Sequence, residues 1–356
     1  MSRLRRAQSR VLNRLAAVPD RWNALQWDGE PGHYEVYYVT FTDTASGVGF
    51  WIRYTMVAPQ PETGEDATCS LWFMAMDPAD PSQNVGEKVS FPISELHARD
   101  MPFELRIGDA VLTDTGMKGA LEHDGRRCEW DLKWLPTLPA YGHVHPFLRR
   151  AGIAKTVLFL PHPDVKVSGT VAWDGRSIDV APGTQGGQAH LWGSKHATRW
   201  AWVHCNDFGE SANGGTFVDG VSVFVPRFSR ELGPNTPVVA RVGGADVMSI
   251  SPLAVQRNQS DFGPWGWTFE AKTLRRKLEC SVTARPEDLV GVTYHDPDGE
   301  LAYCYNTEVA DLRMNVFERS GPFTEWRKTG ELVSDRRAHF EYAQRTPIEG
   351  LGLAVE

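Results

Sequence analysis

The chain has 356 residues, with 37 Lys and Arg against 45 Asp and Glu, which gives a formal net charge of −8. An acidic chain is a poor candidate for general nucleic-acid binding, because that binding depends on neutralisation of phosphates by Lys and Arg. A hydrophobic fraction of 41% with this modest charge excludes disorder as the main state.

The first 29 residues form a basic segment, and residues 3–16 have the pattern of a short helix with Leu and Val side chains along one stripe. No apolar stretch of the kind found in secretory signal peptides follows the arginines. A cationic amphipathic helix can bind an anionic membrane surface, which would give peripheral membrane contact. A helix that packs on the body of the protein, or a frayed end, is the simpler interpretation.

Short strands separated by Gly and Pro are predicted along the rest of the chain. The clearest is 128–134, where Cys128, Trp130, Leu132 and Trp134 alternate with polar residues, the period of a half-buried strand. The other predicted strands are 34–42, 49–57, 68–76, 88–92, 116–122, 165–173, 176–180, 199–208, 216–226, 237–242, 267–273, 277–283, 290–295, 301–308 and 338–345. This pattern predicts an all-β sandwich or barrel.

The strands divide into two groups of similar size. We place the boundary between residues 195 and 196, which gives a basic N-terminal segment (1–29) and two strand-rich domains (30–195 and 196–356). Five cysteines without a CxxC pair predict a reduced, cytoplasmic protein rather than a disulfide framework.

Residues 183–209 hold the densest group of aromatic and polar side chains, within a chain that has 13 tryptophans. In a strand over 199–208, Ala201, Val203 and Cys205 would face a packed core. The opposite face would carry Trp200, Trp202, His204, Asn206 and Phe208. Flat apolar walls with a few polar groups are typical of a ligand cavity, although Trp and His also fill ordinary cores when their N–H groups are hydrogen-bonded.

The same segment carries a resemblance to a known superfamily. His190, Trp192 and Gly193, followed by Trp200, Trp202 and Asn206, resemble the motif region of lipocalin-like proteins that include carotenoid 1,2-hydratase (hydroxyneurosporene synthase), AttH-like proteins and tocopherol cyclase. The hairpin around 167–175 and the segment 340–347 resemble other parts of these proteins. The pieces are spread over much of the chain.

The resemblance implies two lipocalin-like antiparallel β-barrel or sandwich domains side by side, with a ligand site in or between them. It implies a hydrophobic isoprenoid or polyketide-like ligand, and cyclisation, hydration or isomerisation without a metal or other cofactor. A protonated carboxylic acid in an apolar site would begin such a reaction. A non-catalytic lipid or pigment carrier is the alternative, because the same barrels enclose cavities.

The expected site residues follow from this segment and a later aromatic loop. The candidate proton donors are His190, His204 and Asp207, with Glu210 and Asp219 as further acids near the motif. Asp207 lies on the opposite face from His204 unless the strand ends or bulges there. The candidate ligand-binding residues are Trp192, Trp200, Trp202, Asn206, Trp265 and Trp267. The pair His143 and His145 matches no metal motif, and polar loop histidines are expected there.

Overall fold

The computed structural model describes residues 23–150, 154–209, 215–227 and 230–355, so the predicted helix over 3–16 lies outside the described residues. Nearly all regular structure in this part is β, as predicted. The first sheet contains β1(His33–Thr42), β2(Gly49–Ala58), β3(Thr68–Met76), β4(Val85–Pro92), β5(Leu96–Arg99), β6(Glu104–Ile107), β7(Ala110–Thr113), β8(Gly116–His123), β9(Arg126–Pro136), β10(Tyr141–Gly142), β11(Thr156–Trp173), β12(Arg176–Asp179) and β13(Gln185–Gly193).

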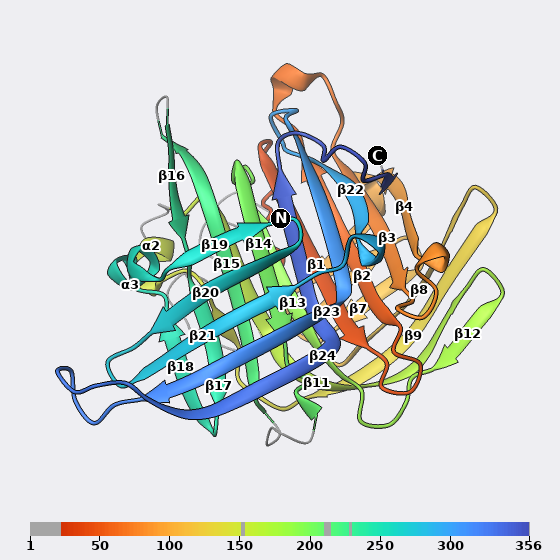
Figure 1. Ribbon diagram of the computed structural model, residues 1–356. Helices are drawn as coiled ribbons and strands as arrows, with labels where there is room; N and C mark the ends of the chain where they lie inside the picture. The colour runs from red at the N-terminus through yellow and green to blue at the C-terminus, as the bar shows by residue number, and fades with distance from the viewer. Residues whose placement is uncertain (1–22, 151–153, 210–214, 228–229, 356) are drawn as a thin grey trace.

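The second sheet is built from the rest of the chain. It contains β14(Arg199–Cys205), β15(Phe217–Arg227), β16(Arg230–Asn235), β17(Val238–Val242), β18(Ala245–Ser249), β19(Ser260–Gly263), β20(Gly266–Lys272), β21(Arg276–Thr283), β22(Val290–His295), β23(Leu301–Glu318), β24(Arg327–Gln344) and β25(Leu353–Val355). Both sheets are antiparallel except where β25 pairs with β22. Figure 1 shows the sheets side by side, with the short helices α2(Pro146–Arg150) and α3(Pro252–Arg257) near each other.

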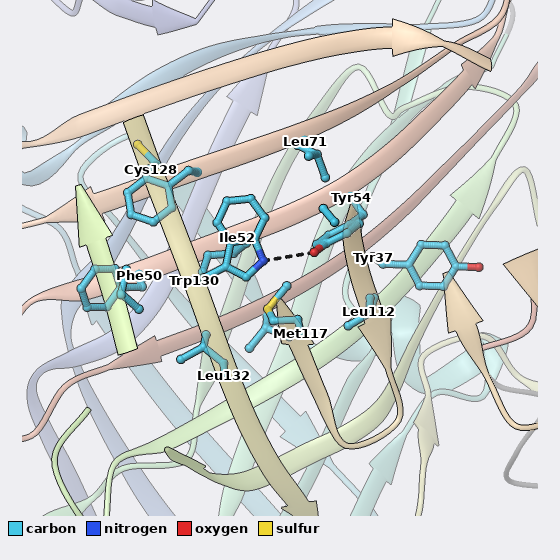
Figure 2. Packing of buried hydrophobic residues seen from close by; sticks show 14 of the residues in the cluster. Tyr37, Phe50, Ile52, Tyr54, Leu71, Leu112, Met117, Cys128, Trp130 and Leu132 are labelled. Atoms are coloured by element: carbon cyan, nitrogen blue, oxygen red, sulfur yellow. Dashed lines mark hydrogen bonds between the residues drawn. The ribbon is translucent and has the colours of Figure 1, made fainter. Parts of the chain in front are cut away.

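Each sheet curls around its own hydrophobic core. In the first sheet β2 and β9 are separated by three strands, yet the indole N–H of Trp130 donates to the hydroxyl of Tyr54 at 3.1 Å across the core (Figure 2). A second core gathers Val203, Trp267 and Phe340 from the other sheet. The sheets divide between Gly193 and Arg199. That each of them is an independent domain, as placed at residue 196, stays a prediction.

The outer faces of the two sheets pack on each other through a third cluster, which includes Tyr34, Tyr38, Trp51, Trp200 and Trp202. Glycines bring the sheets close together at one end of this contact. A Cβ built at Gly49 of β2 would lie 2.6 Å from Cβ of Glu308 in β23. A Cβ at Gly187 of β13 would lie 2.6 Å from Nε2 of His204 in β14. The inter-sheet contact is therefore tight where glycine stands, and any larger side chain would separate the sheets.

Candidate functional site

A cavity of about 600 Å³ lies between the two sheets. The first sheet contributes Tyr34, Val36, Tyr38, Trp51, Arg53, Leu158 and Leu191 to its wall, and the second contributes Trp200, Trp202, Val221, Val223, Tyr294 and Glu341. The segment around α2, the 195–197 connection and α3 line the remainder. This volume and lining are typical of a small-molecule site.

The alternation of β14 places its aromatic residues in this cavity. Ala201, Val203 and Cys205 face the core of the second sheet, whereas Trp200 and Trp202 face the first sheet and line the cavity. The strand register then sets Trp202 beside Val221 on one neighbouring strand and beside Glu341 on the other. One row further along, His204 lies beside Asp219 and His339. The polar groups of the second sheet therefore form a row at the edge of the aromatic wall.

Aromatic rings surround the cavity and hold one another in place. His196, in the connection between the sheets, stacks on Tyr34 with ring centroids 4.2 Å apart and on Trp200 at 5.3 Å. Tyr38 meets Trp202 edge to face at 5.5 Å, and Trp51 packs near Tyr38. Such ring pairs are rigid and present π-faces that stabilise a nearby positive charge.

Asp219 joins two histidines and a tryptophan at this wall. Its Oδ1 lies 2.9 Å from Nε2 of His143 and its Oδ2 lies 3.0 Å from Nδ1 of His204, while the indole N–H of Trp202 donates to Oδ1 at 3.2 Å. Burial disfavours the ionised form of Asp219, but the charges and hydrogen bonds of His143 and His204 outweigh it and lower its pKa. Asp219 is therefore a carboxylate that holds both imidazoles in fixed orientations.

His143 is the titratable member of this group that lines the cavity. It comes from the β10–α2 connection, is 4% exposed, and its Nδ1 has no hydrogen-bond partner among the described residues. The polar loop histidine expected at this position is instead a buried residue held by a carboxylate. Its burial depends on docking of the 141–145 segment against β15, which no local pattern in the sequence reveals.

Glu341 is the carboxyl group in the wall of the cavity. The indole N–H of Trp200 donates to its Oε1, and the hydroxyl of Tyr294 donates to its Oε2 at 3.4 Å. These two hydrogen bonds fix the orientation of the carboxyl group. Alternation in the segment 340–347 is the sequence signal for this position. Phe340 faces the core of the second sheet, so the neighbouring Glu341 faces the opposite side, towards the cavity.

The structure separates His190 and Trp192 from Trp200 and Trp202, which corrects the single pocket expected for them. On β13, Leu191 points into the inter-sheet cavity, so its neighbours His190 and Trp192 point to the other face, with the pairing partner Tyr37. His190 is fully buried, stacks on Tyr37 at 4.0 Å and lies 2.8 Å from Oε1 of Glu35 through Nε2. His190 therefore belongs to the interior of the first sheet, and Trp192 lies half-buried on the same face, stacked on Phe159 at 5.4 Å.

The buried carboxylate of Glu35 explains the presence of a histidine at position 190. This carboxylate accepts hydrogen bonds from the backbone N–H groups of Gln26 and Trp27, from the Tyr37 hydroxyl and from His33, besides His190. Burial opposes ionisation of Glu35, but the hydrogen bonds from His190 and His33 prevail and lower its pKa to about 2. This network fixes the entry of the chain into β1, and it is structural.

We expect His190→Phe to lower the free energy of unfolding at pH 7 by about 2 kcal/mol, because a buried carboxylate loses a charge-assisted hydrogen bond. Ligand binding between the sheets should be unaffected. The stability contributed by Glu35 is present above its unfolded pKa and is lost as pH falls from about 4.5 towards 2, so the deficit should shrink at pH 2.5. Urea denaturation at both pH values measures this. Exposed His97→Phe is the control, and an equal deficit for it would contradict the assignment.

The remaining predicted site residues also lie away from the cavity. β14 ends at Cys205, so Asn206 leaves the stripe and its side-chain N–H donates to the backbone oxygen of Gly186 at 2.7 Å. Asp207 pairs with Arg337 at 2.9 Å, outside the cavity lining. Trp267 is buried in the core of the second sheet, and Trp265 is exposed in a turn. Glu210 lies outside the described residues.

One acidic group in the described part of the chain has metal-ligand spacing, namely Asp296, Asp298 and Glu300. Each acid already pairs with a cation of the protein, since Lys195 lies 2.6 Å from Asp298 and 2.9 Å from Glu300, and Arg345 lies 2.7 Å from Asp296. These acids hold the connection between the sheets in place. No helix within the described ranges combines the length and hydrophobicity that crossing a membrane requires.

Comparisons with known proteins agree with this architecture. The uncharacterized protein Rv0493c of Mycobacterium tuberculosis is 28% identical over 310 residues, which cover 85% of each chain. Two solved structures share the fold over most of their length. CghA with bound Sch210972 gives a TM-score of 0.58 at 9% identity, over 93% of this chain and 96% of that one. Kievitone hydratase from Nectria haematococca gives 0.50 at 10% identity, over 89% of each chain.

A match to a protein-family model shows the family to which the chain belongs. The model described as tocopherol cyclase-like matches residues 32–337, which cover the first sheet and most of the second. The chain belongs to the tocopherol cyclase-like family.

Proposed function

We propose that the protein binds a largely apolar small molecule in the inter-sheet cavity and catalyses its hydration or cyclisation by proton transfer. The observation that carries the proposal is the pair of His143 and Asp219, 2.9 Å apart at the wall of an aromatic cavity. A wall with one oriented imidazole and one separate carboxylate has the two proton-transfer groups that such a reaction needs.

In the proposed reaction protonated His143 delivers a proton from Nδ1 to one carbon of an alkene. The electron pair of the double bond forms the new C–H bond, and the other carbon becomes cationic. Trp200, Trp202 and Tyr38 stabilise this cation with their π-faces. Asp219 stabilises the imidazolium before transfer and remains ionised throughout, because both of its oxygens are engaged.

The cation is then captured by an oxygen nucleophile. In hydration this is water, and in cyclisation it is a hydroxyl of the same molecule. The oxygen lone pair forms the C–O bond, and the oxygen loses its proton to the carboxylate of Glu341. Return of one proton from Glu341 through solvent to His143 completes the cycle, so no oxidant or reductant is consumed.

The family relationship supports this chemistry, since the matching model is named for a cyclase and a protein of the same fold is a hydratase. An isoprenoid or polyketide-like ligand is part of the proposal, because the aromatic wall suits a branched or polycyclic hydrocarbon body. A reduced, cytoplasmic location is also proposed, and the five cysteines, all free and buried, support it.

The test begins with the ligand. Molecules that co-purify are extracted and identified by native mass spectrometry, then incubated with fresh protein in D₂O. Hydration should add 20 Da before back-exchange, and cyclisation should leave one non-exchangeable deuterium on carbon. A ligand that returns chemically unchanged would instead establish a carrier, the second function that the cavity allows.

We expect Asp219→Asn to slow turnover about 100-fold with little change in ligand affinity, because the imidazolium loses its counter-charge. Asp207→Asn, which alters a carboxylate outside the cavity, should leave turnover unchanged. Rates from the same D₂O incubation check both variants. Full activity of Asp219→Asn would contradict the role given to His143 and Asp219.

A further inference from the structure

Arg53 is a cation in the middle of the inter-sheet space. It lies on β2, is 5% exposed, and lines both the main cavity and a second cavity of about 370 Å³. The two cavities share Tyr34, Val36, Arg53, His196 and Tyr294, so Arg53 stands at their common boundary. The Arg53 side chain therefore borders both cavities.

Aromatic rings surround the guanidinium in place of carboxylates. Its Cζ lies 4.3 Å from the ring centre of Tyr294, 5.0 Å from that of Trp51 and 5.2 Å from that of Trp72. Arg53 forms no ion pair with any described residue. Its Nε and Nη1 atoms are buried and have no hydrogen-bond partner in the described part of the chain.

None of the acids that line the two cavities forms an ion pair with Arg53. Glu341 is held by Trp200 and Tyr294, while Glu65 and Asp66 are exposed residues of the second cavity. Lys88, on the face of Trp72 in the same cavity, adds a second positive charge. Cation–π contacts offset part of the desolvation of an arginine, but they do not use its N–H groups. A buried cation whose N–H donors lack partners costs free energy of folding. An anion that binds the guanidinium would remove that cost.

We infer that the ligand carries one anionic group, a carboxylate or an acidic enol, which binds Arg53 while the apolar body fills the main cavity. This inference rests on the proposed function for the identity of the site and specifies the class of its ligand. A guanidinium and a carboxylate can form a bidentate pair with two parallel hydrogen bonds. The π-faces around Arg53 fix the plane of its guanidinium for that contact. A neutral isoprenoid would leave the cation unpaired.

The test compares two probes with the same hydrocarbon body, cis-parinaric acid and its methyl ester, titrated by fluorescence at pH 8. The wild-type protein should bind the acid at least 10-fold more tightly than the ester. Arg53→Met should bring that ratio to about 1 and leave ester affinity within about 2-fold. The same substitution at an exposed arginine, Arg106→Met, should keep the wild-type ratio.

Equal affinity of the wild-type protein for acid and ester, or equal weakening of both by Arg53→Met, would overturn the inference and leave the cavity as a ligand site. Absence of binding for both probes would contradict the proposed function itself. Thermal unfolding of the ligand-free variants reports folding, and Arg53→Gln supplies a second neutral side chain. Because an unpaired buried charge is removed, Arg53→Met should melt no lower than the wild-type protein.

Discussion

Glu308→Gln should make the protein more stable at neutral pH, by on the order of 4 kcal/mol at pH 7–8. Glu308 is fully buried where β23 meets the first sheet, and the Thr40 hydroxyl donates to its Oε2 at 2.7 Å. Burial raises its pKa to about 8, and the charge of Glu341 adds to this effect against the hydrogen bond from Thr40.

The direction of the pH dependence follows from this raised pKa. The folded state keeps a proton on Glu308 that the unfolded chain releases above about pH 4.5, so the folded state binds more protons between pH 4.5 and 8. Stability from this group is complete at low pH and is lost as pH rises through that interval. Gln resembles the neutral acid and has no proton to lose, so the loss is absent in the variant.

Urea denaturation from pH 5 to pH 8.5 measures the effect as the difference between variant and wild type. Burial lowers the pKa of His339 and that of His162, and these groups make stability rise with pH in the acidic part of this range. The contribution of His162 cancels in the difference. His339 lies 3.6 Å from Glu308, so the comparison is read above pH 6.5, where His339 is neutral in both the folded and the unfolded state. Parallel stability curves for the two proteins would show that Glu308 is not protonated in the folded state.

Gly49→Ala should destabilise the protein by about 3 kcal/mol, because overpacking of a tight contact forces the backbone to move. The new Cβ would meet Cβ of Glu308 at 2.6 Å and its backbone oxygen at 2.9 Å, and neither atom can rotate away. The same movement would break the hydrogen bond that the Thr42 hydroxyl donates to the Glu308 carbonyl at 2.7 Å. Chemical denaturation measures the loss.

Gly263→Ala is the matched control, since Gly263 also lies in a strand but has no atom within 4 Å of an added Cβ among the described residues. It should be neutral or slightly stabilising, because Ala restricts the unfolded chain. Equal stability of Gly49→Ala and wild type would mean that the two sheets are not in contact at this point. A crystal structure of Gly49→Ala should show the sheets farther apart and the cavity altered.

Local periodicity was sufficient to predict most strands. In 128–134 the predicted inward residues Cys128, Trp130, Leu132 and Trp134 are all buried in the first core. The same argument divided β14 correctly between core and cavity. Strands β5–β7 were missed because they are only four residues long and the alternation within each is too brief to recognise.

The site was only partly accessible from the sequence, because it is formed by long-range pairing. Alternation gives the two faces of β13 but not which of them meets the other sheet, so the sequence alone cannot separate His190 from Trp200. Asp219 was named among the acids, yet its partner His143 is 76 positions away in a connecting segment. Arg53 carries a signal in the sequence, since it is the one charged residue of the predicted strand 49–57.

The cavity lies outside both hydrophobic cores, and this has an evolutionary consequence. Tyr38, Trp200 and Trp202 belong to the inter-sheet cluster, whereas the interiors that stabilise each sheet are made of other residues. Substitutions that reshape the ligand site can therefore accumulate without emptying either interior. Such a scaffold can diversify its substrates while its architecture persists. Relatives that share the fold can then differ in the reaction they catalyse through substitutions confined to the inter-sheet contact.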